Sequence, residues 1–212
     1  MEITWLGHSC FKLKSRNGTV INDPFDESIG YKIGKVSADI VTVSHDHPGH
    51  NCVSAIDGNP KVIAGPGEYE IAGIFIYGVR TYHDDKKGEE RGKNTSYLIE
   101  IDDIKICHLG DLGHIPTAAQ LDEISDIDVL LIPVGGNSTI DASVAIEVVN
   151  IMTPTFVIPM HYKTDAIARD LEPPDKFLKE MGAKDIIPEP RLNITKSTMP
   201  IDMQTVVLDY KQ

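Results

Sequence analysis

Cysteine is scarce in this 212-residue sequence, and hydrophobic runs of membrane length are missing. The three cysteines, Cys10, Cys52 and Cys107, form no Cys-x-x-Cys pair, which argues against a disulfide framework and is typical of reduced thiols in a cytoplasm. No stretch reaches the roughly 18 uncharged apolar residues of a membrane helix. The start, Met-Glu-Ile-Thr-Trp, lacks the basic and apolar regions of a secretory signal. We therefore expect a cytoplasmic protein that does not enter a membrane.

Basic residues are also in the minority, with 20 Lys and Arg against 32 Asp and Glu, so the net charge at pH 7 is −12. Such a charge repels phosphate backbones and anionic membranes, which disfavours a general nucleic-acid-binding role. The hydrophobic fraction of 41% excludes disorder as the main state. Because the chain shows no repeat, low-complexity tract or Ser/Pro linker, we expect one domain over residues 1–212.

Short β-rich runs separated by turn residues dominate the first half of the chain. Arg16-Asn17-Gly18 and Asp102-Asp103 are typical of hairpin connections, which predicts antiparallel meanders. Two later runs are apolar throughout, which indicates strands buried on both faces between helices and a second sheet. The expected strands are residues 3–6, 10–13, 19–21, 40–44, 61–64, 69–80, 96–101, 104–109, 129–133, 156–159 and 205–208.

Helices are fewer and have clear start signals. Pro116 predicts a helix to about residue 124, Asp141 caps another to about residue 152, and Pro174 begins a third that ends near Gly182. A short helix is expected after Asn51. These elements predict an α+β fold in which a β-sandwich carries its helices on the outside.

The sharpest chemical signal follows the buried run at residues 40–43, where residues 44–50 read Ser-His-Asp-His-Pro-Gly-His. In extended backbone, residues two apart project to the same side, so His45 and His47 can converge. The Pro-Gly turn can then bring His50 back toward them. Solvated histidines are the alternative, but three within six residues directly after a buried strand favour a metal site, because imidazole is a common metal ligand.

Other candidates also follow expected strands: His83, Asp111 and His161. Taken singly, each is explained at least as well by solvation or turn capping. Together with the histidine loop they form a set at the strand ends. Upstream, Asp23 follows another strand, and a buried carboxylate there could accept hydrogen bonds that orient the histidine loop.

The order of these motifs resembles the metallo-β-lactamase superfamily and, within it, the ascorbate-6-phosphate lactonase-like group of metal-dependent hydrolases. This resemblance implies a four-layer αββα sandwich with a metal centre at one edge between the sheets. It also implies that His45, His47 and His83 bind one metal, that His50 and His161 bind a second, and that Asp111 bridges them. The matching motifs are Leu6-Gly7-His8-Ser9, Asp23-Pro24, His45-x-His47-x-x-His50, His83, Gly110-Asp111, Pro133-Val134-Gly135-Gly136-Asn137 and Pro159-Met160-His161-Tyr162.

One position departs from the superfamily pattern. The usual loop is His-x-His-x-Asp-His, and Gly49 stands where that Asp is expected. The missing carboxylate ordinarily binds the second metal and helps to orient the attacking water. Asp46 should point to the opposite side, but His50, His161 and Asp111 remain a possible ligand set. We therefore expect one firm site and a weakened second one. Zinc is the default metal, and Mn, Fe, Co and Ni fit the same nitrogen and oxygen donors.

A bound divalent metal lowers the pKa of its water to about 7, which makes hydroxide available for hydrolysis. The expected function is therefore hydrolysis of a small ester, lactone or phosphodiester, with Asp111 positioning the nucleophile. The remaining candidates have weaker support, because each has a structural explanation as well. They are His8 and His114 in the pocket, and Lys163, Tyr162, Asn137, Arg91 and Lys93 as substrate contacts.

Three alternatives stay open at this stage. A nuclease would need a local basic patch to overcome the net charge of −12. A regulatory metal-binding protein would result if the loss of the Asp at position 49 had ended turnover. Redox chemistry ranks third, because no flavin or iron–sulfur motif accompanies the His and Asp set. The resemblance also implies that a homo-oligomer is to be expected.

Overall fold

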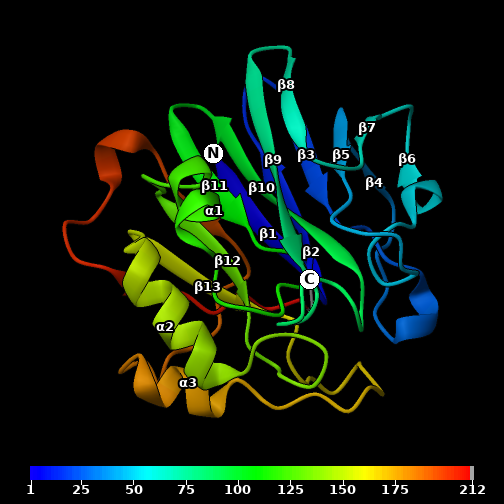
Figure 1. Ribbon diagram of the computed structural model, residues 1–212. Coiled ribbons are helices and arrows are strands. Elements are labelled where there is room, and N and C mark those ends of the chain that lie inside the picture. The colour runs from blue at the N-terminus through cyan, green and yellow to red at the C-terminus, as the bar shows by residue number, and fades with distance from the viewer. Residues whose placement is uncertain (211–212) are drawn as a thin grey trace.

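In the computed structural model, which describes residues 1–210, two β-sheets pack face to face (Figure 1). The first sheet has the order β14 (Leu192–Asn193), β1 (Glu2–Gly7), β2 (Cys10–Lys14), β3 (Thr19–Asn22), β5 (Ile40–Thr42) and β7 (Lys61–Ile63). The second has the order β15 (Gln204–Thr205), β13 (Phe156–Met160), β12 (Val129–Pro133), β11 (Ile104–His108), β10 (Lys93–Ile101), β9 (Ile74–Tyr82) and β8 (Gly67–Ile71).

The directions of the strands determine at which edge of each sheet their carboxyl ends gather. In the first sheet β2 is antiparallel to both neighbours, and β3, β5 and β7 are parallel, so β1, β3 and β5 run the same way. In the second sheet β9, β11, β12 and β13 likewise share one direction, because β10 is antiparallel to both β9 and β11. The carboxyl ends of these strands therefore gather at one edge of each sheet.

The two faces of the first sheet contact different layers. Phe11, Val20 and Ile40 point into the core between the sheets. Their neighbours Cys10 and Ile21 point outward into a second apolar cluster. This alternation is the period of two expected of strands.

The outer cluster is covered by short elements, which form the fourth layer of the sandwich. They are the 3₁₀ helices η1 (Glu27–Ile29) and η2 (Val53–Ala55) and the two-stranded sheet of β4 (Val36–Ser37) and β6 (Ile56–Asp57). The short helix expected after Asn51 is η2. A further 3₁₀ helix, η3 (Lys196–Thr198), lies near the carboxyl terminus.

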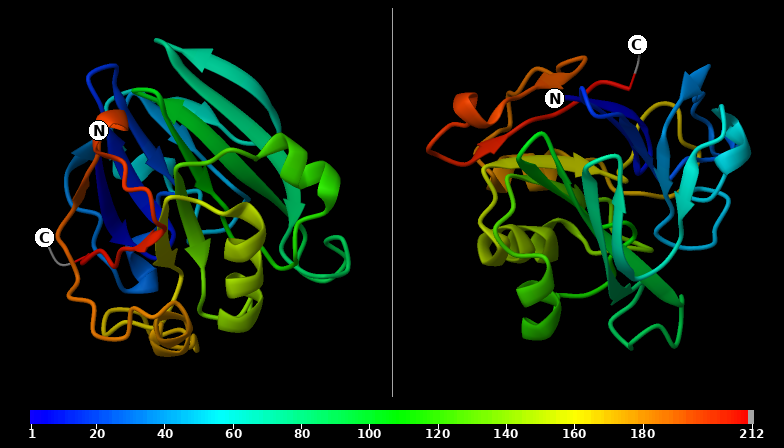
Figure 2. Two further views of the ribbon diagram at one scale, coloured as in Figure 1. Left: turned by 90° about the vertical axis from the view of Figure 1, so that its left-hand side faces the viewer. Right: turned by 90° about the horizontal axis from the view of Figure 1, so that it is seen from above.

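The three α-helices lie on the outer face of the second sheet, as the two views of Figure 2 show together with Figure 1. They are α1 (Ala118–Glu123), α2 (Ala142–Met152) and α3 (Asp175–Glu180). The expected cap of α2 is confirmed, because the Asp141 carboxylate accepts from the Val144 amide at 2.9 Å. The strands beneath, β12 and β13, are buried at every residue, as their unbroken apolar runs predicted.

Two strand predictions were wrong. Residues 69–80 do not form one strand, because a turn at Ala72 and Gly73, both with positive φ, divides them into the hairpin β8–β9. The closing strand at residues 205–208 is shorter than expected: β15 ends at Thr205, and Leu208 makes only an isolated bridge to Glu189. Within residues 1–210, none of the helices has the length and apolar character that a membrane span requires.

We predict that Leu131→Ala lowers the free energy of unfolding by about 2–5 kcal/mol, because Leu131 is fully buried in the central strand β12 and its removal leaves a cavity. Denaturant unfolding monitored by circular dichroism measures the change. The control is Ile201→Ala at a fully exposed isoleucine, which should shift the same quantity by less than about 0.5 kcal/mol. Equal losses in the two variants would contradict the assigned core.

Candidate metal centre

Each expected ligand follows the carboxyl end of a strand. In the first sheet, His8 comes after β1, Asp23 after β3, and the histidine loop after β5. In the second sheet, His83, Asp111 and His161 come after β9, β11 and β13. Because these strands share a direction within each sheet, their ends meet at one edge of the sandwich. The fold therefore brings together residues that are up to 153 positions apart in the chain.

The buried carboxylate of Asp111 is the meeting point of the cluster. Its Oδ2 atom lies 3.1 Å from His83 Nε2, 3.2 Å from His50 Nε2, 3.4 Å from His161 Nε2 and 4.0 Å from His45 Nε2. Asp111 is itself held by the Asn94 side chain, which accepts from the Asp111 amide at 3.1 Å. One carboxylate oxygen thus faces four imidazoles from three loops.

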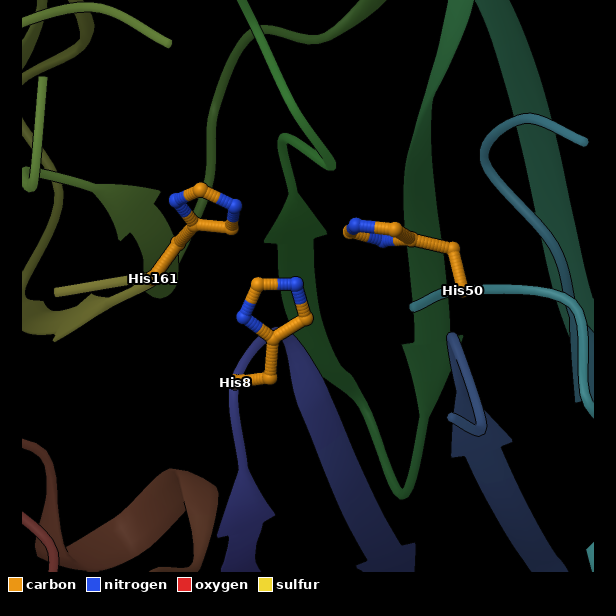
Figure 3. A group of neighbouring side chains, drawn as sticks. All are labelled: His8, His50 and His161. Carbon is orange, nitrogen blue, oxygen red and sulfur yellow. The ribbon is translucent and has the colours of Figure 1, made fainter. Parts of the chain in front are cut away.

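The histidines form overlapping groups whose ligand atoms lie within 4.8 Å of one another. One group is His45, His83 and Asp111, a second is His45, His47 and His50, and a third is His8, His50 and His161. The expected first set is therefore divided: His45 and His83 lie with Asp111, whereas His47 lies beside His45 and His50. Figure 3 shows the third group, with the three rings directed toward a common gap.

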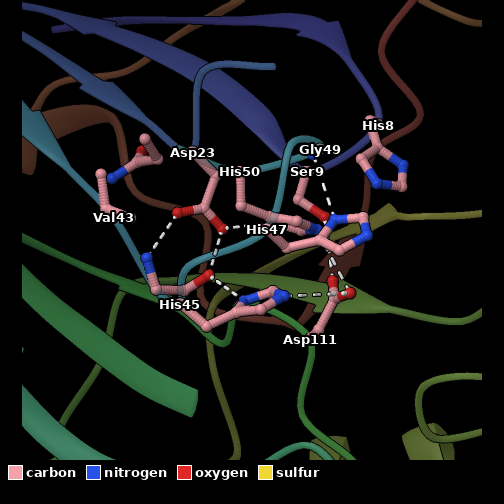
Figure 4. A network of polar contacts seen from close by, with 12 residues as sticks. His8, Ser9, Asp23, Val43, His45, His47, Gly49, His50 and Asp111 are labelled. Atoms are coloured by element: carbon pink, nitrogen blue, oxygen red, sulfur yellow. Dashed lines mark hydrogen bonds and ion pairs between the residues drawn. The ribbon is translucent and has the colours of Figure 1, made fainter. Parts of the chain in front are cut away.

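Asp23 orients the rings of His50 and His45 so that the Nε2 atom of each faces Asp111 (Figure 4). Its carboxylate accepts from the Ser44 amide at 2.7 Å, from Ser44 Oγ at 2.6 Å and from His50 Nδ1 at 2.8 Å. Since Ser44 gives its only hydroxyl proton to Asp23, its oxygen accepts from His45 Nδ1 at 3.0 Å. Both rings therefore carry a proton on Nδ1, and Nε2 of His45 offers a lone pair to a metal.

The electrostatics fit the same arrangement. Burial opposes ionisation of Asp111, but the neighbouring imidazoles of His161 and His50 hold the pKa of its carboxyl well below the usual range. Burial lowers the pKa of His45 to about 4, which keeps this ring neutral. Burial alone would also lower the pKa of His50, but Asp111 and Asp23 on its two sides raise it to about 10. A cation must therefore displace a proton from His50.

Unpartnered nitrogens indicate that a cation fits the cluster. Among residues 1–210, buried ring nitrogens without a hydrogen bond occur on five of its histidines, and in two of these, His8 and His161, neither nitrogen makes a hydrogen bond. An unpaired buried polar atom costs about 1–3 kcal/mol. Imidazole and carboxylate donors without thiolate suit Zn, Mn, Fe, Co or Ni. The donor set and its unsatisfied atoms are thus those of a divalent metal site.

Several other candidates from the sequence have their polar atoms engaged elsewhere. His114 accepts from the Tyr82 amide at Nε2 and donates to the Ile115 carbonyl from Nδ1, so neither nitrogen is free for proton transfer. Lys163 donates its ammonium to the carbonyls of Ile167 and Arg169 at 2.7 and 2.9 Å. These two residues support loops and do not face the cluster.

Tyr162 packs in the core, with its ring centroid 5.1 Å from that of Trp5. Asn137 is exposed on a turn and donates to the Asp170 carbonyl. Arg91 is exposed in a loop folded around Asp84, whose carboxylate accepts the Arg91 amide at 2.7 Å. Within residues 1–210, none of the three makes a hydrogen bond, ion pair or ring contact with the histidines of the cluster.

A cleft of about 490 Å³ opens beside His45, and it contains the one substrate candidate that the fold brings to the cluster, Lys93. Arg80 lines the same cleft, although no sequence motif marks it. Arg169 was also missed: its Nη2 atom lies 3.5 Å from His47 Nε2. Both arginines come from segments with no sequence link to the histidine loop, so only the fold reveals them.

Comparison with known proteins agrees with this geometry. Residues 2–161 match the family described as the Beta-lactamase superfamily domain, so the chain belongs to the metallo-β-lactamase superfamily. A protein of Pyrococcus furiosus named as a UPF0173 protein is 30% identical over 209 residues, covering 88% of this chain and 93% of its own. A UPF0173 metal-dependent hydrolase of Thermococcus onnurineus is 28% identical over 87% of this chain and 93% of its own. The particular family is therefore UPF0173, a family of metal-dependent hydrolases.

Solved structures confirm the fold. A crystal structure from Thermotoga maritima, described as a candidate Zn-dependent hydrolase of the metallo-β-lactamase superfamily, superimposes with a TM-score of 0.80. It is 41% identical, and the match covers 98% of this chain and 97% of that one. The αββα sandwich expected from the resemblance is thereby confirmed.

We predict that Asp23→Asn weakens metal binding by about 10- to 100-fold, the usual loss when a partner that orients a ligand is removed. An amide at this position presents a donor to Ser44 and His50, which already donate to Asp23. Competition with a chromophoric chelator measures the affinity. Asp26→Asn is the matched control, because Asp26 is exposed and its oxygen only caps the Ser28 amide. Equal affinities in both variants would show that Asp23 does not orient the ligands.

Proposed function

We propose that the protein hydrolyses a small ester, lactone or phosphodiester at a centre of divalent cations held by the imidazole cluster and Asp111. The observation that carries this proposal is the position of Asp111 Oδ2, which lies 3.1–3.4 Å from Nε2 of His83, His50 and His161. Lactones are included because the motifs resemble those of the ascorbate-6-phosphate lactonase-like group.

Zinc is the metal that we propose first. The 41% identical protein of Thermotoga maritima is described as a candidate Zn-dependent hydrolase, and nitrogen with carboxylate donors suits zinc. Manganese, iron, cobalt and nickel are alternatives with the same donors. His45, His83 and Asp111 would hold the first cation, with His47 beside them.

A divalent cation in this cluster would supply Lewis acidity and a water molecule of lowered pKa. The chain contributes the fixed geometry around it. Asp111 stays anionic because the surrounding imidazoles keep its pKa low, so it can accept a hydrogen bond from a nucleophilic water. Asp23 and Ser44 hold the rings of His50 and His45 in orientation. No serine or cysteine nucleophile is needed.

The cleft beside His45 supports a small anionic substrate. Arg80 and Lys93 line it, together with Asp46 and apolar side chains such as Val43 and Val62. Its volume of about 490 Å³ lies within the usual range for small-molecule pockets. Cations at the proposed centre would attract a compact anion locally. The net charge of −12 on the whole chain would repel a long nucleic-acid strand. We also propose a cytoplasmic location, which the free thiols of the chain support.

We predict that the metal-loaded protein cleaves at least one member of a panel of bis-p-nitrophenyl phosphate, p-nitrophenyl esters and lactones. His45→Ala should reduce kcat/KM by about 100-fold or more, because it removes a ring that faces Asp111. Initial rates with and without a chelator provide the measurement.

The control for this assay is His114→Ala, which removes an imidazole whose two nitrogens bind only backbone atoms. Loss of activity in His45→Ala beside retained activity in His114→Ala supports the proposed centre. Turnover that survives both chelation and the loss of His45 would refute it.

The lining of the cleft gives a separate prediction. Lys93→Ala should raise KM for an anionic substrate by about tenfold and leave kcat nearly unchanged, because Lys93 lines the cleft and is not a member of the imidazole cluster. A neutral substrate from the same panel should show no change in KM. Lys179→Ala, at an exposed position on α3, is the control. A fall in kcat with unchanged KM would contradict an anchoring role for Lys93.

A further inference from the structure

A side chain at position 49 would crowd the ring of His8. A Cβ atom at position 49 would lie 3.0 Å from His8 Nε2 and 3.3 Å from His8 Cδ2. It would also lie 3.2 Å from His47 Nδ1. The backbone of Gly49 is not in the left-handed region, so its conformation does not require glycine. Crowding by the two imidazoles, and not backbone strain, distinguishes this position.

The ring of His8 is buried without a partner. The residue is 1% exposed, and neither Nδ1 nor Nε2 makes a hydrogen bond among the described residues. A structural histidine in the same fold behaves differently: buried His108 uses Nε2 on the Ser9 carbonyl and accepts the Gly110 amide at Nδ1. Two unpaired nitrogens on one buried ring therefore point to a ligand for His8 rather than to a packing role.

The neighbours of His8 are the residues expected at the second metal. Its ring centroid lies 4.3 Å from that of His161 and 5.0 Å from that of His50. Both nitrogens of His161 and Nε2 of His50 are likewise buried without a hydrogen bond. Asp111 Oδ2 lies 3.2 Å from His50 Nε2 and 3.4 Å from His161 Nε2. Three imidazoles thus surround a common gap (Figure 3), and the Asp111 carboxylate lies beside two of them.

The backbone holds His8 in this place at some cost. His8 and His161 both have positive φ, 53° and 50°, a strained conformation for residues other than glycine. The His161 amide donates to the His8 carbonyl at 3.1 Å, and Trp5 Nε1 donates to the same oxygen at 3.0 Å. These bonds fix the ends of β1 and β13 against each other with their imidazoles side by side.

We propose that His8 is a ligand of the second metal and replaces the carboxylate that position 49 lacks. The second site is then His8, His50 and His161, with Asp111 shared between the two sites. The second site, expected from the sequence to be weakened, would then have a full set of ligands, with the His8 imidazole in place of a carboxylate at position 49. The exchange removes one negative charge and one hard oxygen donor, which favours zinc, cobalt or nickel over manganese at this site.

This inference rests on the proposed metal centre, and metal counting tests the two separately. Metal-free protein is loaded with Zn²⁺ and desalted, the bound metal is counted by mass spectrometry, and the affinity of the second equivalent is measured with a chromophoric chelator. Wild type should hold two equivalents per chain. His8→Ala should keep the first and lose at least about 10- to 100-fold in affinity for the second, because removal of a merely orienting partner already has that effect.

Two further variants sharpen the assignment. His8→Ala combined with Gly49→Asp should regain the second equivalent, because the new carboxylate enters the space that the ring has left and the backbone there accepts a side chain. His114→Ala, which removes an imidazole bound only to backbone, should hold two equivalents. Recovery in the double variant is not expected if His8 has only a packing role.

The outcomes distinguish the two claims. A wild type that holds no metal refutes the proposed centre and the role of His8 with it. A second equivalent that is equally tight in wild type and His8→Ala, or a wild type limited to one equivalent, overturns the role of His8 alone. If His8→Ala does not fold, an anomalous difference map of the Zn-loaded wild type decides. A peak about 2.0–2.1 Å from a ring nitrogen of His8 supports the proposal, and a peak that leaves His8 uncoordinated refutes it.

Discussion

The fold of this protein is organised around a concentration of unsatisfied polar atoms at one buried edge. Asp111 is surrounded by four imidazoles from three loops, and several of their nitrogens make no hydrogen bond among the described residues. An apolar core tolerates such a cluster only if something satisfies it, because each unpaired buried group costs free energy. The two sheets therefore act as a scaffold that holds these polar side chains close together in a buried position.

The orientation of these side chains depends on an outer layer of hydrogen bonds. Asp23 directs His50 and, through the Ser44 hydroxyl, also His45. The carboxylate thus determines the tautomers of two rings that come from a single loop. Paired backbone supports the same loop, since Ser44 lies two residues after β5, a strand paired on both sides. The first sheet therefore fixes the positions of the His45 and His50 rings at the cluster.

The sequence pointed to side chains that the fold brings together at one edge, because each follows a strand and carries a chemically specific group. It predicted neighbouring residues poorly, since adjacency in the chain does not determine direction: Tyr162 follows His161 but packs on Trp5. Arg80 was missed because it has no motif and reaches the cleft only through the pairing of β9 and β10. The hairpin at Ala72-Gly73 was missed because Ala is an unusual residue at positive φ.

The ligands of the centre come from both sheets, and the chain order of those ligands constrains when the centre can form. His8 follows β1, and His161 comes only after six strands of the second sheet have been made. During synthesis, domains fold as their segments emerge from the ribosome. A nascent chain that ends before β13 has every other imidazole of the cluster but not its last one. The proposed centre can therefore be complete only after β13 and His161 have been translated.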